Sequence, residues 1–439
     1  MLNNIKNIFN IEDLRKRIFF TIGLLIVYRL GCHIPTPGID SQALTNFFDS
    51  QAKGTLFGMF DMFSGGALKR ASIFALGVMP YINASIIMQL LTAVVPSLEK
   101  LSKEGTEGHK KISQYSLYLA IGIAILQSVF MSIGLESLRG PGGMTFVREP
   151  GFFFRIISAM TFTAGTMTIV WLGEQITERG IGNGVSIIIL SGIIAEMPTV
   201  FTNVFALVQT GEIKIFSLIL MLIFIIFIVA SVVYIEEGYS KIPIQYARRI
   251  IGSKTYGGQS THLPLKVDQS GVIAVIFAAT IIIIPGTIAQ FAKNPILTKI
   301  AGYISPGSVL YAFIYGPLII FFCFFYTAIT FNPVDIAENL KKSGGFIPGI
   351  RPGSATAEYI ENIMNRITLV GALFVTMICI IPIYIGKYFN LASLFTHFSG
   401  TSILILVGVS IDTMKQVESH LLMRHYDGFM KKGKLKASD

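Results

Sequence analysis

The feature that most constrains this chain is a succession of apolar runs, each long enough to cross a lipid bilayer as a helix. About ten such runs occur, and each approaches the ~20 mostly apolar residues that a spanning helix needs. The runs are longer than membrane β-strands and lack the alternation of a barrel. The sequence therefore predicts an all-α membrane protein. The predicted spans lie near residues 18–34, 73–95, 113–134, 152–172, 184–202, 215–235, 271–291, 307–330, 367–386 and 399–415.

Composition agrees with a surface that faces lipid. Only 14% of the 439 residues are charged, whereas a soluble protein carries roughly a quarter. Cys32, Cys323 and Cys379 stand far apart without metal-ligand spacing, so we interpret them as free, packed thiols.

The sequence lacks the motifs that signal catalysis or cofactor binding. It contains no GxxxxGK[ST] phosphate loop, and RGIGNG at 179–184 opens a span instead of joining a strand to a helix. The six histidines share no ligand spacing, and no Ser-His-Asp or paired-carboxylate arrangement falls within the spans. We therefore expect no enzymatic activity, no cofactor and no metal.

Charge within the spans is sparse, being mainly Arg29, with Glu174 and Glu178 at a span end. Proton-coupled pumps and ion carriers usually place acidic residues or histidine in mid-membrane. This scarcity favours a passive conduit, or a device whose energy comes from elsewhere. Uncharged polar residues have two interpretations, hydrogen bonds between helices or a polar interior. They are Asn83, Gln89, Thr161, Thr163, Thr166, Asn183 and Ser186.

Basic residues give the orientation. One assignment of the loops puts 24 of the 35 Lys and Arg on one side of the membrane, and the positive-inside rule makes that side cytoplasmic. Both termini are then cytoplasmic, and the spans divide into two inverted halves of five. The expected regions are an N-terminal segment (1–17), a first half (18–202), an external linker (203–214), a second half (215–415) and a basic cytoplasmic tail (416–439).

Two long cytoplasmic loops, 236–270 and 331–366, carry basic residues with Gly and Pro. Loops of this length are usually functional. They either dock something large and acidic or serve only as topology signals, and the pattern alone does not separate these two interpretations.

An interrupted apolar segment, FGMFDMFSGGALKRASIFALG (57–77), precedes the second span. The apolar stretch from Leu56 to Val95 would be about 60 Å long as one helix, twice the ~30 Å hydrocarbon thickness, so it must break. Gly65 and Gly66 are the expected bend. Lys69 and Arg70 are expected to face a water-filled funnel. Pattern alone favours an interfacial loop helix on the outer side.

Two stretches resemble the signature segments of the SecY family, the central subunit of the bacterial protein-conducting channel. They are SIFALGVMPYINASIIMQLL (72–91) and WLGEQITERGIGNGVSIII (171–189). The resemblance continues through QSTHLPLKV (259–267), FFCFFYTAITFNP (321–333) and NLKKSGGFIPGIRPG (339–353). It implies ten helices in two inverted halves around an hourglass pore, closed by an aliphatic ring and a short plug helix. The implied function is to pass unfolded secretory proteins across the bacterial cytoplasmic membrane and to release apolar segments sideways into lipid.

The resemblance also implies site residues. The pore ring would be Val78, Ile82, Val185, Ile189, Ile276 and Ile405. The plug, within 57–70, would comprise Phe60, Asp61, Met62, Phe63, Ser64, Gly65, Gly66, Ala67, Leu68, Lys69 and Arg70. Asn83 and Ile284 match the lateral gate, and Gln89 and Asn183 match a polar cluster that steadies the closed state. Arg248, Arg249, Lys254 and Arg351 match partner-docking positions.

The partners implied by the resemblance are the small subunits SecE and SecG, the motor ATPase SecA, the ribosome, signal peptides with their unfolded precursors, and membrane lipids. The chain departs from the family pattern at Ala274, where many members have Pro, and at Asp61, where Asn is frequent. Ring positions 78 and 185 are Val where Ile is common. Two alternatives from other classes are a secondary transporter of a small solute, suggested by the inverted halves and the broken span, and a structural scaffold.

Overall fold

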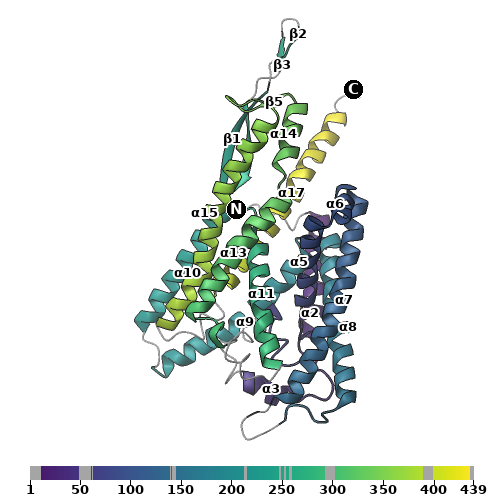
Figure 1. Ribbon diagram of the computed structural model, residues 1–439, viewed down its shortest axis with the longest axis vertical. Helices are drawn as coiled ribbons and strands as arrows, with labels where there is room; N and C mark the ends of the chain where they lie inside the picture. The colour runs from purple at the N-terminus through teal and green to yellow at the C-terminus, as the bar shows by residue number, and fades with distance from the viewer. Residues whose placement is uncertain are drawn as a thin grey trace.

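The protein is described from a computed structural model over residues 11–48, 61, 63–138, 140, 145–211, 215–246, 249–251, 254–256, 260–291, 302–388 and 399–435. Most of these residues are helical, and Figure 1 shows long helices side by side with small strands at one end. Every predicted span lies largely within one helix. The ten helices are α2 (Glu12–Gly31), α5 (Met79–Val94), α7 (Thr106–Ser137), α8 (Phe152–Arg179), α9 (Gly184–Gln209), α10 (Ile215–Glu236), α11 (Gly271–Phe291), α13 (Val309–Thr330), α15 (Ser354–Tyr388) and α17 (Gly400–Leu435).

Length and composition identify the membrane-crossing helices. Within the described ranges, six helices are long and apolar enough to span, or seven if α5 and α6 (Pro96–Lys103) count as one broken span bent by 98°. Since a chain with several such helices crosses the bilayer repeatedly, this is a multi-pass membrane protein.

The helices form two groups (Figure 1). In the first group α7 packs between α5 and α8, and α8 packs against α9. In the second group α13 packs between α11 and α15, and α15 contacts α10 and α17. The groups meet where α11 contacts α5 and α7 and where α17 contacts α9. The helices at this junction are therefore α5, α7, α9, α11 and α17.

The second span begins later than predicted. Its helix α5 starts at Met79, whereas residues 64–78 form turns. Pro80 in the first helical turn has no N–H to leave unpaired, and Gly77 has φ +57°, a conformation that favours glycine. At the other end of the first group, α9 continues to Gln209, into the region predicted as linker.

The two cytoplasmic loops are more ordered than expected, because they share one sheet. Strand β1 (Tyr239–Tyr246) pairs antiparallel with β4 (Ser260–Lys266) and with β5 (Gly345–Phe346), which comes from the other loop. Helix α14 (Pro333–Lys342) and the beginning of α15 fill the rest of that loop. This sheet was not predicted from the sequence, although Ile242 and Ile244 alternate with exposed neighbours in β1.

A second pair of strands, β2 (Arg249–Ile251) and β3 (Lys254–Tyr256), extends from this sheet. Figure 1 shows it projecting beyond β1, β5 and α14, away from the helices. A short helix, α3 (Ser41–Phe47), lies at the opposite end of the molecule, so the strands mark one end and α3 the other.

Candidate functional site

The predicted ring residues lie in one continuous apolar core where the two helix groups meet. They come from α5 or its N-cap, α9, α11 and α17. Five are at most 6% exposed: Val78, Ile82, Ile189, Ile276 and Ile405. The sixth, Val185, is partly buried and packs against α8, since a Cβ on Gly173 would come within 3.2 Å of its Cγ2. Aliphatic side chains thus fill the centre of the molecule.

The apolar face of the predicted plug belongs to the same core. Phe63, Ala67 and Leu68 are at most 2% exposed and cluster with the ring residues. Asp61 and Phe63 have helical backbone, and residues 64–70 are mostly turns. Phe60 and Met62 lie outside the described residues. The described plug segment is therefore a compact turn packed inside the bundle, and an interfacial helix does not fit it.

The bend of the plug falls at the glycine pair. Gly65 has φ +66° and Gly66 has φ +79°, both in the left-handed region that favours glycine. The N–H of Gly66 donates to the Asp61 carbonyl at 3.0 Å and closes the turn. A Cβ on Gly65 would lie 2.8 Å from the Cα of Gly192 in α9. Two glycines thus allow the turn and α9 to approach closely.

Helix α2 holds the same turn through hydrogen bonds to its backbone. The hydroxyl of Tyr28 donates to the Ser64 carbonyl at 3.1 Å, and the Arg29 guanidinium donates to the Gly65 carbonyl at 2.8 Å. Arg29 is the charge that the sequence places inside the first span. Its partner is the carbonyl of the plug turn, which explains how a cation is accommodated at this depth.

Lys69 has a different environment from the one predicted. Its Nζ lies 2.9 Å from Oε1 of Glu196 in α9, and the two side chains are 17% and 8% exposed. The expectation that Lys69 faces a water-filled funnel was therefore wrong. The sequence analysis also missed Glu196, although an acidic residue inside the predicted span 184–202 was a usable signal, because such a residue needs a partner.

The predicted polar cluster does not form as one network. The Asn183 side chain caps α9 by accepting from the Ser186 N–H at 3.2 Å, and the Gln89 amide donates to the Ser85 hydroxyl at 3.5 Å. Both side chains are described, and no hydrogen bond joins one to the other. Gln89 Oε1 is buried without a hydrogen-bond partner in the structure.

The predicted gate helices, α5 and α11, are in contact. The Thr280 hydroxyl of α11 lies 3.8 Å from the sulfur of Met79 in α5, and both residues are buried. Asn83 is 9% exposed, one position beyond Ile82 on α5. Ile284 lies on α11, but its side chain is outside the described part of the chain. The two helices are therefore packed together at Met79 and Thr280.

The predicted docking residues lie at the strand end of the molecule. Arg249 begins β2 and Lys254 begins β3, which pair with each other, while Arg248 is outside the described residues. Arg351 is exposed in the turn between β5 and α15. Since β5 pairs with β1, the fold brings both basic loops to one end of the molecule (Figure 1).

Charged residues also anchor the base of this sheet. Lys266 at the end of β4 bonds Glu236 at 3.2 Å. Asp268 accepts from the Ser270 hydroxyl at 2.9 Å and from the Gly271 N–H at 2.8 Å, which caps α11. Burial raises the pKa of Asp268, although those two hydrogen bonds oppose the rise. These contacts lie between the end of β4 and the start of α11.

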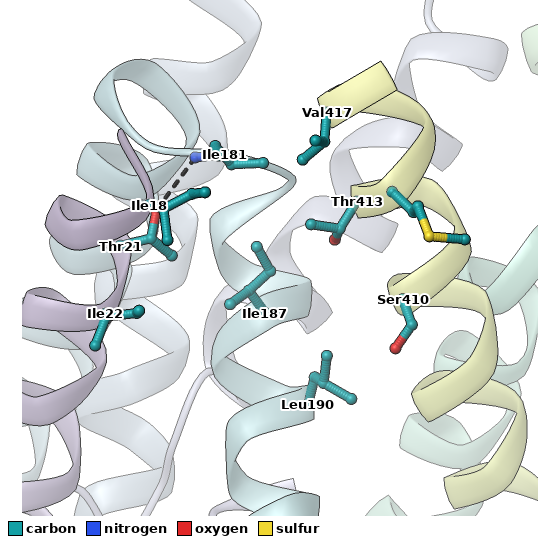
Figure 2. A pocket seen from close by; sticks show the side chains of 10 residues that line it. Ile18, Thr21, Ile22, Ile181, Ile187, Leu190, Ser410, Thr413 and Val417 are labelled. Carbon is teal, nitrogen blue, oxygen red and sulfur yellow. Dashed lines mark hydrogen bonds between the residues drawn. The ribbon is translucent and has the colours of Figure 1, made fainter. Parts of the chain in front are cut away.

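An apolar crevice of about 410 Å³ lies between the two helix groups (Figure 2). Its walls come from α2, the α8–α9 turn, α9 and α17. The Ile181 N–H of the turn donates to the Thr21 hydroxyl, and the Gly182 N–H donates to the Gln416 side chain of α17. The lining residues are Ile18, Thr21, Ile22, Ile181, Ile187, Leu190, Ser410, Thr413, Met414 and Val417, so the crevice is separate from the ring.

Comparison with known proteins decides the family. The SecY family model matches residues 72–414, a stretch that contains every predicted ring residue. The chain belongs to the SecY family. SecY subunits from several bacteria align over nearly the whole chain. The protein translocase subunit SecY of Escherichia coli K12 is 48% identical over 428 residues, covering 97% of this chain and 95% of the relative. That of Aquifex aeolicus is 44% identical, covering 98% and 100%.

Solved structures support the SecY fold. A structure described as a protein conducting channel matches with a TM-score of 0.67 at 18% identity, covering 92% of each chain. Another, on the plug domain of the SecY protein and the closed state of its translocation channel, matches with a TM-score of 0.65 at 18% identity and the same coverage. A channel in a canine ribosome complex from the endoplasmic reticulum has a TM-score of 0.62 at 16% identity. The prediction of a SecY-type helical architecture is confirmed.

Proposed function

We propose that this chain is the channel subunit of a bacterial protein translocase, passing unfolded secretory proteins across the cytoplasmic membrane. The observation that carries the proposal is the shared apolar core in which ring residues from both helix groups pack with the plug turn. The bacterial relatives reported above are named translocase subunits. This leaves the solute transporter and the scaffold without comparable support.

The ring acts as the seal in this proposal. Aliphatic side chains cannot replace the hydration of an ion, so a constriction of them resists wetting and leakage. They also offer no hydrogen bonds or charges to retain a passing segment. Ile82, Ile189, Ile276 and Ile405 would part as the two helix groups separate, and the plug turn would leave its place beside them.

Sideways release would occur between α5 and α11. Their contact at Met79 and Thr280 is apolar apart from a weak hydroxyl–sulfur interaction, so its separation leaves few polar groups unpaired in lipid. An apolar segment of the client would replace the α5–α11 packing. Asn83 and Ile284 would line that opening.

The end of the molecule that carries the strands would bind the cytoplasmic partners. Arg248, Arg249, Lys254 and Arg351 suit ribosomal RNA phosphates or acidic residues of SecA, and the matching canine channel was solved with a ribosome. In this proposal SecE and SecG complete the membrane complex and both termini are cytoplasmic. The two halves are those predicted from the sequence, except that the first half extends to Gln209 at the end of α9. The chain itself performs no catalysis, because SecA or the ribosome supplies the energy.

Reconstitution tests the proposal. Vesicles containing the chain with SecE, SecG and SecA should make a signal-bearing precursor resistant to added protease when ATP is present. The same precursor without its signal serves as the control and should remain digestible. ATP-independent protection, or none in a complex that still binds SecA, would contradict the proposal.

A further inference from the structure

An ion pair links the plug turn to α9, and its geometry is specific. Lys69 Nζ lies 2.9 Å from Glu196 Oε1 and 4.0 Å from Asp61 Oδ2. The backbone N–H of Lys69 also donates to Asp61 Oδ1 at 2.9 Å. Asp61 is 7% exposed and Glu196 is equally buried. One ammonium group therefore lies between two buried carboxylates.

These two carboxylates belong to different parts of the fold. Asp61 precedes the glycine turn and is hydrogen-bonded to it, since Gly66 and Lys69 both donate to Asp61. Glu196 belongs to α9, a helix of the surrounding bundle. If the plug turn moves as a unit, Asp61 moves with Lys69, while Glu196 stays behind.

The other attachments of the plug turn differ in kind. Tyr28 and Arg29 donate to the backbone carbonyls of Ser64 and Gly65, and water can replace such bonds once the turn is exposed. The Lys69–Glu196 pair joins two largely buried side-chain charges, and removing one partner of such a pair is unfavourable. Among these contacts, the ion pair therefore depends most on the identity of its side chains.

We infer that the Lys69–Glu196 pair is a latch that holds the plug in the closed channel, and that Asp61 is the carboxylate to which Lys69 transfers when the plug moves. This inference rests on the proposed function. With Asp61 attached to the same turn, Lys69 keeps a carboxylate beside it when it separates from Glu196. Lys69, Glu196 and Asp61 are positioning residues, because they act through the plug and contact no client in the closed state.

The inference predicts opposite effects for the two carboxylates. Glu196→Gln removes the partner that stays behind, so the closed state loses stability relative to the open one. Asp61→Asn keeps an oxygen for the Lys69 N–H and removes the repulsion between two buried carboxylates. It also removes the carboxylate to which Lys69 would transfer when the plug turn moves. Glu196→Gln and Lys69→Met should therefore favour opening, whereas Asp61→Asn should oppose it.

Planar bilayers containing the chain with SecE and SecG test the latch by resting ion conductance, without any client. Glu196→Gln and Lys69→Met should each raise the conductance several-fold, the double variant should resemble either single variant, and Asp61→Asn should lower it. Lys103→Met is the matched control. It breaks an exposed pair with Glu99 at 2.7 Å and should leave conductance unchanged.

Translocation of a precursor with a shortened apolar signal provides a second readout. The Glu196→Gln variant, with its weaker latch, should translocate more of this precursor than the original chain. The Asp61→Asn variant should translocate less of it. The latch would be overturned if Glu196→Gln changed neither the resting conductance nor the translocation of the shortened-signal precursor. The transfer to Asp61 would be overturned if Glu196→Gln and Asp61→Asn shifted the conductance in the same direction. Failure of the original chain to translocate a full-strength signal would instead contradict the proposed function. A monodisperse complex with normal thermal unfolding shows that a variant has folded.

Discussion

At the scale of single residues, the structure explains why the plug segment contains paired glycines. The sequence predicted a bend at Gly65 and Gly66 from their conformational freedom, and the positive φ angles agree. It did not predict the close approach of Gly192 or the pairing of Lys69 with Glu196, because both depend on which face of α9 meets the turn. That face is set by packing between helices, which spacing along one helix does not reveal.

Gly65→Ala should loosen the plug. The left-handed backbone costs a residue with a Cβ about 1–2 kcal/mol, and the new Cβ would clash with Gly192 Cα at 2.8 Å. We expect a higher resting ion conductance in planar bilayers. Gly105→Ala is the control, because Gly105 has φ +76° but open space around its Cβ position. Equal conductance for both variants would contradict the role of close packing.

Ile82→Asn should make the resting channel leak ions, because a polar side chain in the ring helps water to enter the constriction. Ile87 provides the control on the same helix, since it is 40% exposed and outside the ring. Conductance of single channels should rise several-fold for Ile82→Asn and little for Ile87→Asn. A similar rise for both would mean that α5 as a whole, and not the ring, forms the seal.

At the scale of helices and strands, the apolar runs predicted each spanning helix well, since about 20 apolar residues leave few other solutions in lipid. The cytoplasmic sheet was missed for two reasons. Its strand β1 carries Pro243, a residue type that is depleted in strands, and its partner β5 lies about a hundred residues away along the chain. Strand pairing over that distance leaves little local signal beyond the alternation of Ile242 and Ile244.

Replacing Arg249 and Lys254 with Gln should weaken binding to ribosomes and reduce its salt dependence. Each phosphate that the protein no longer neutralises lowers the slope of log affinity against log salt by about 0.7–0.9, so two such phosphates should lower it by about 1.4–1.8. Cosedimentation over a range of salt concentrations measures the slope. Lys341→Gln and Lys342→Gln on exposed α14 are the charge-matched control. An unchanged slope for the β2–β3 variant would place the docking surface elsewhere.

Asp268→Ala should destabilise the start of α11, because it removes the acceptor for the Gly271 N–H. Loss of a helix cap costs about 1 kcal/mol, which should speed hydrogen exchange at the first turn of α11. Asp268→Asn keeps an acceptor and removes a buried carboxyl group whose pKa is raised by burial. The first turn of α11 in this variant should therefore exchange its amide hydrogens at the same rate as in the original chain. Equal acceleration in both variants would show that the charge, and not the cap, matters.

At the scale of the whole molecule, the two helix groups meet through aliphatic side chains, with the plug turn packed against them. Nothing in one span alone distinguishes a ring residue from any other buried aliphatic. The common position of the ring residues becomes visible only when α5, α9, α11 and α17 are assembled. From the sequence, these residues could be predicted only through the resemblance to the SecY family. The proposed function therefore depends on whether a client passes through this centre.

Crosslinking within a stalled translocation complex tests that claim most directly. A photoreactive residue at 82 should form adducts with a polar stretch of a precursor that is halted in mid-transit. The same probe at 87, on the exposed face of α5, should not. Adducts at 82 that require both the signal sequence and ATP are the result expected for a pore lined by the ring. A halted, protease-protected precursor that crosslinks at 87 and not at 82 would contradict it.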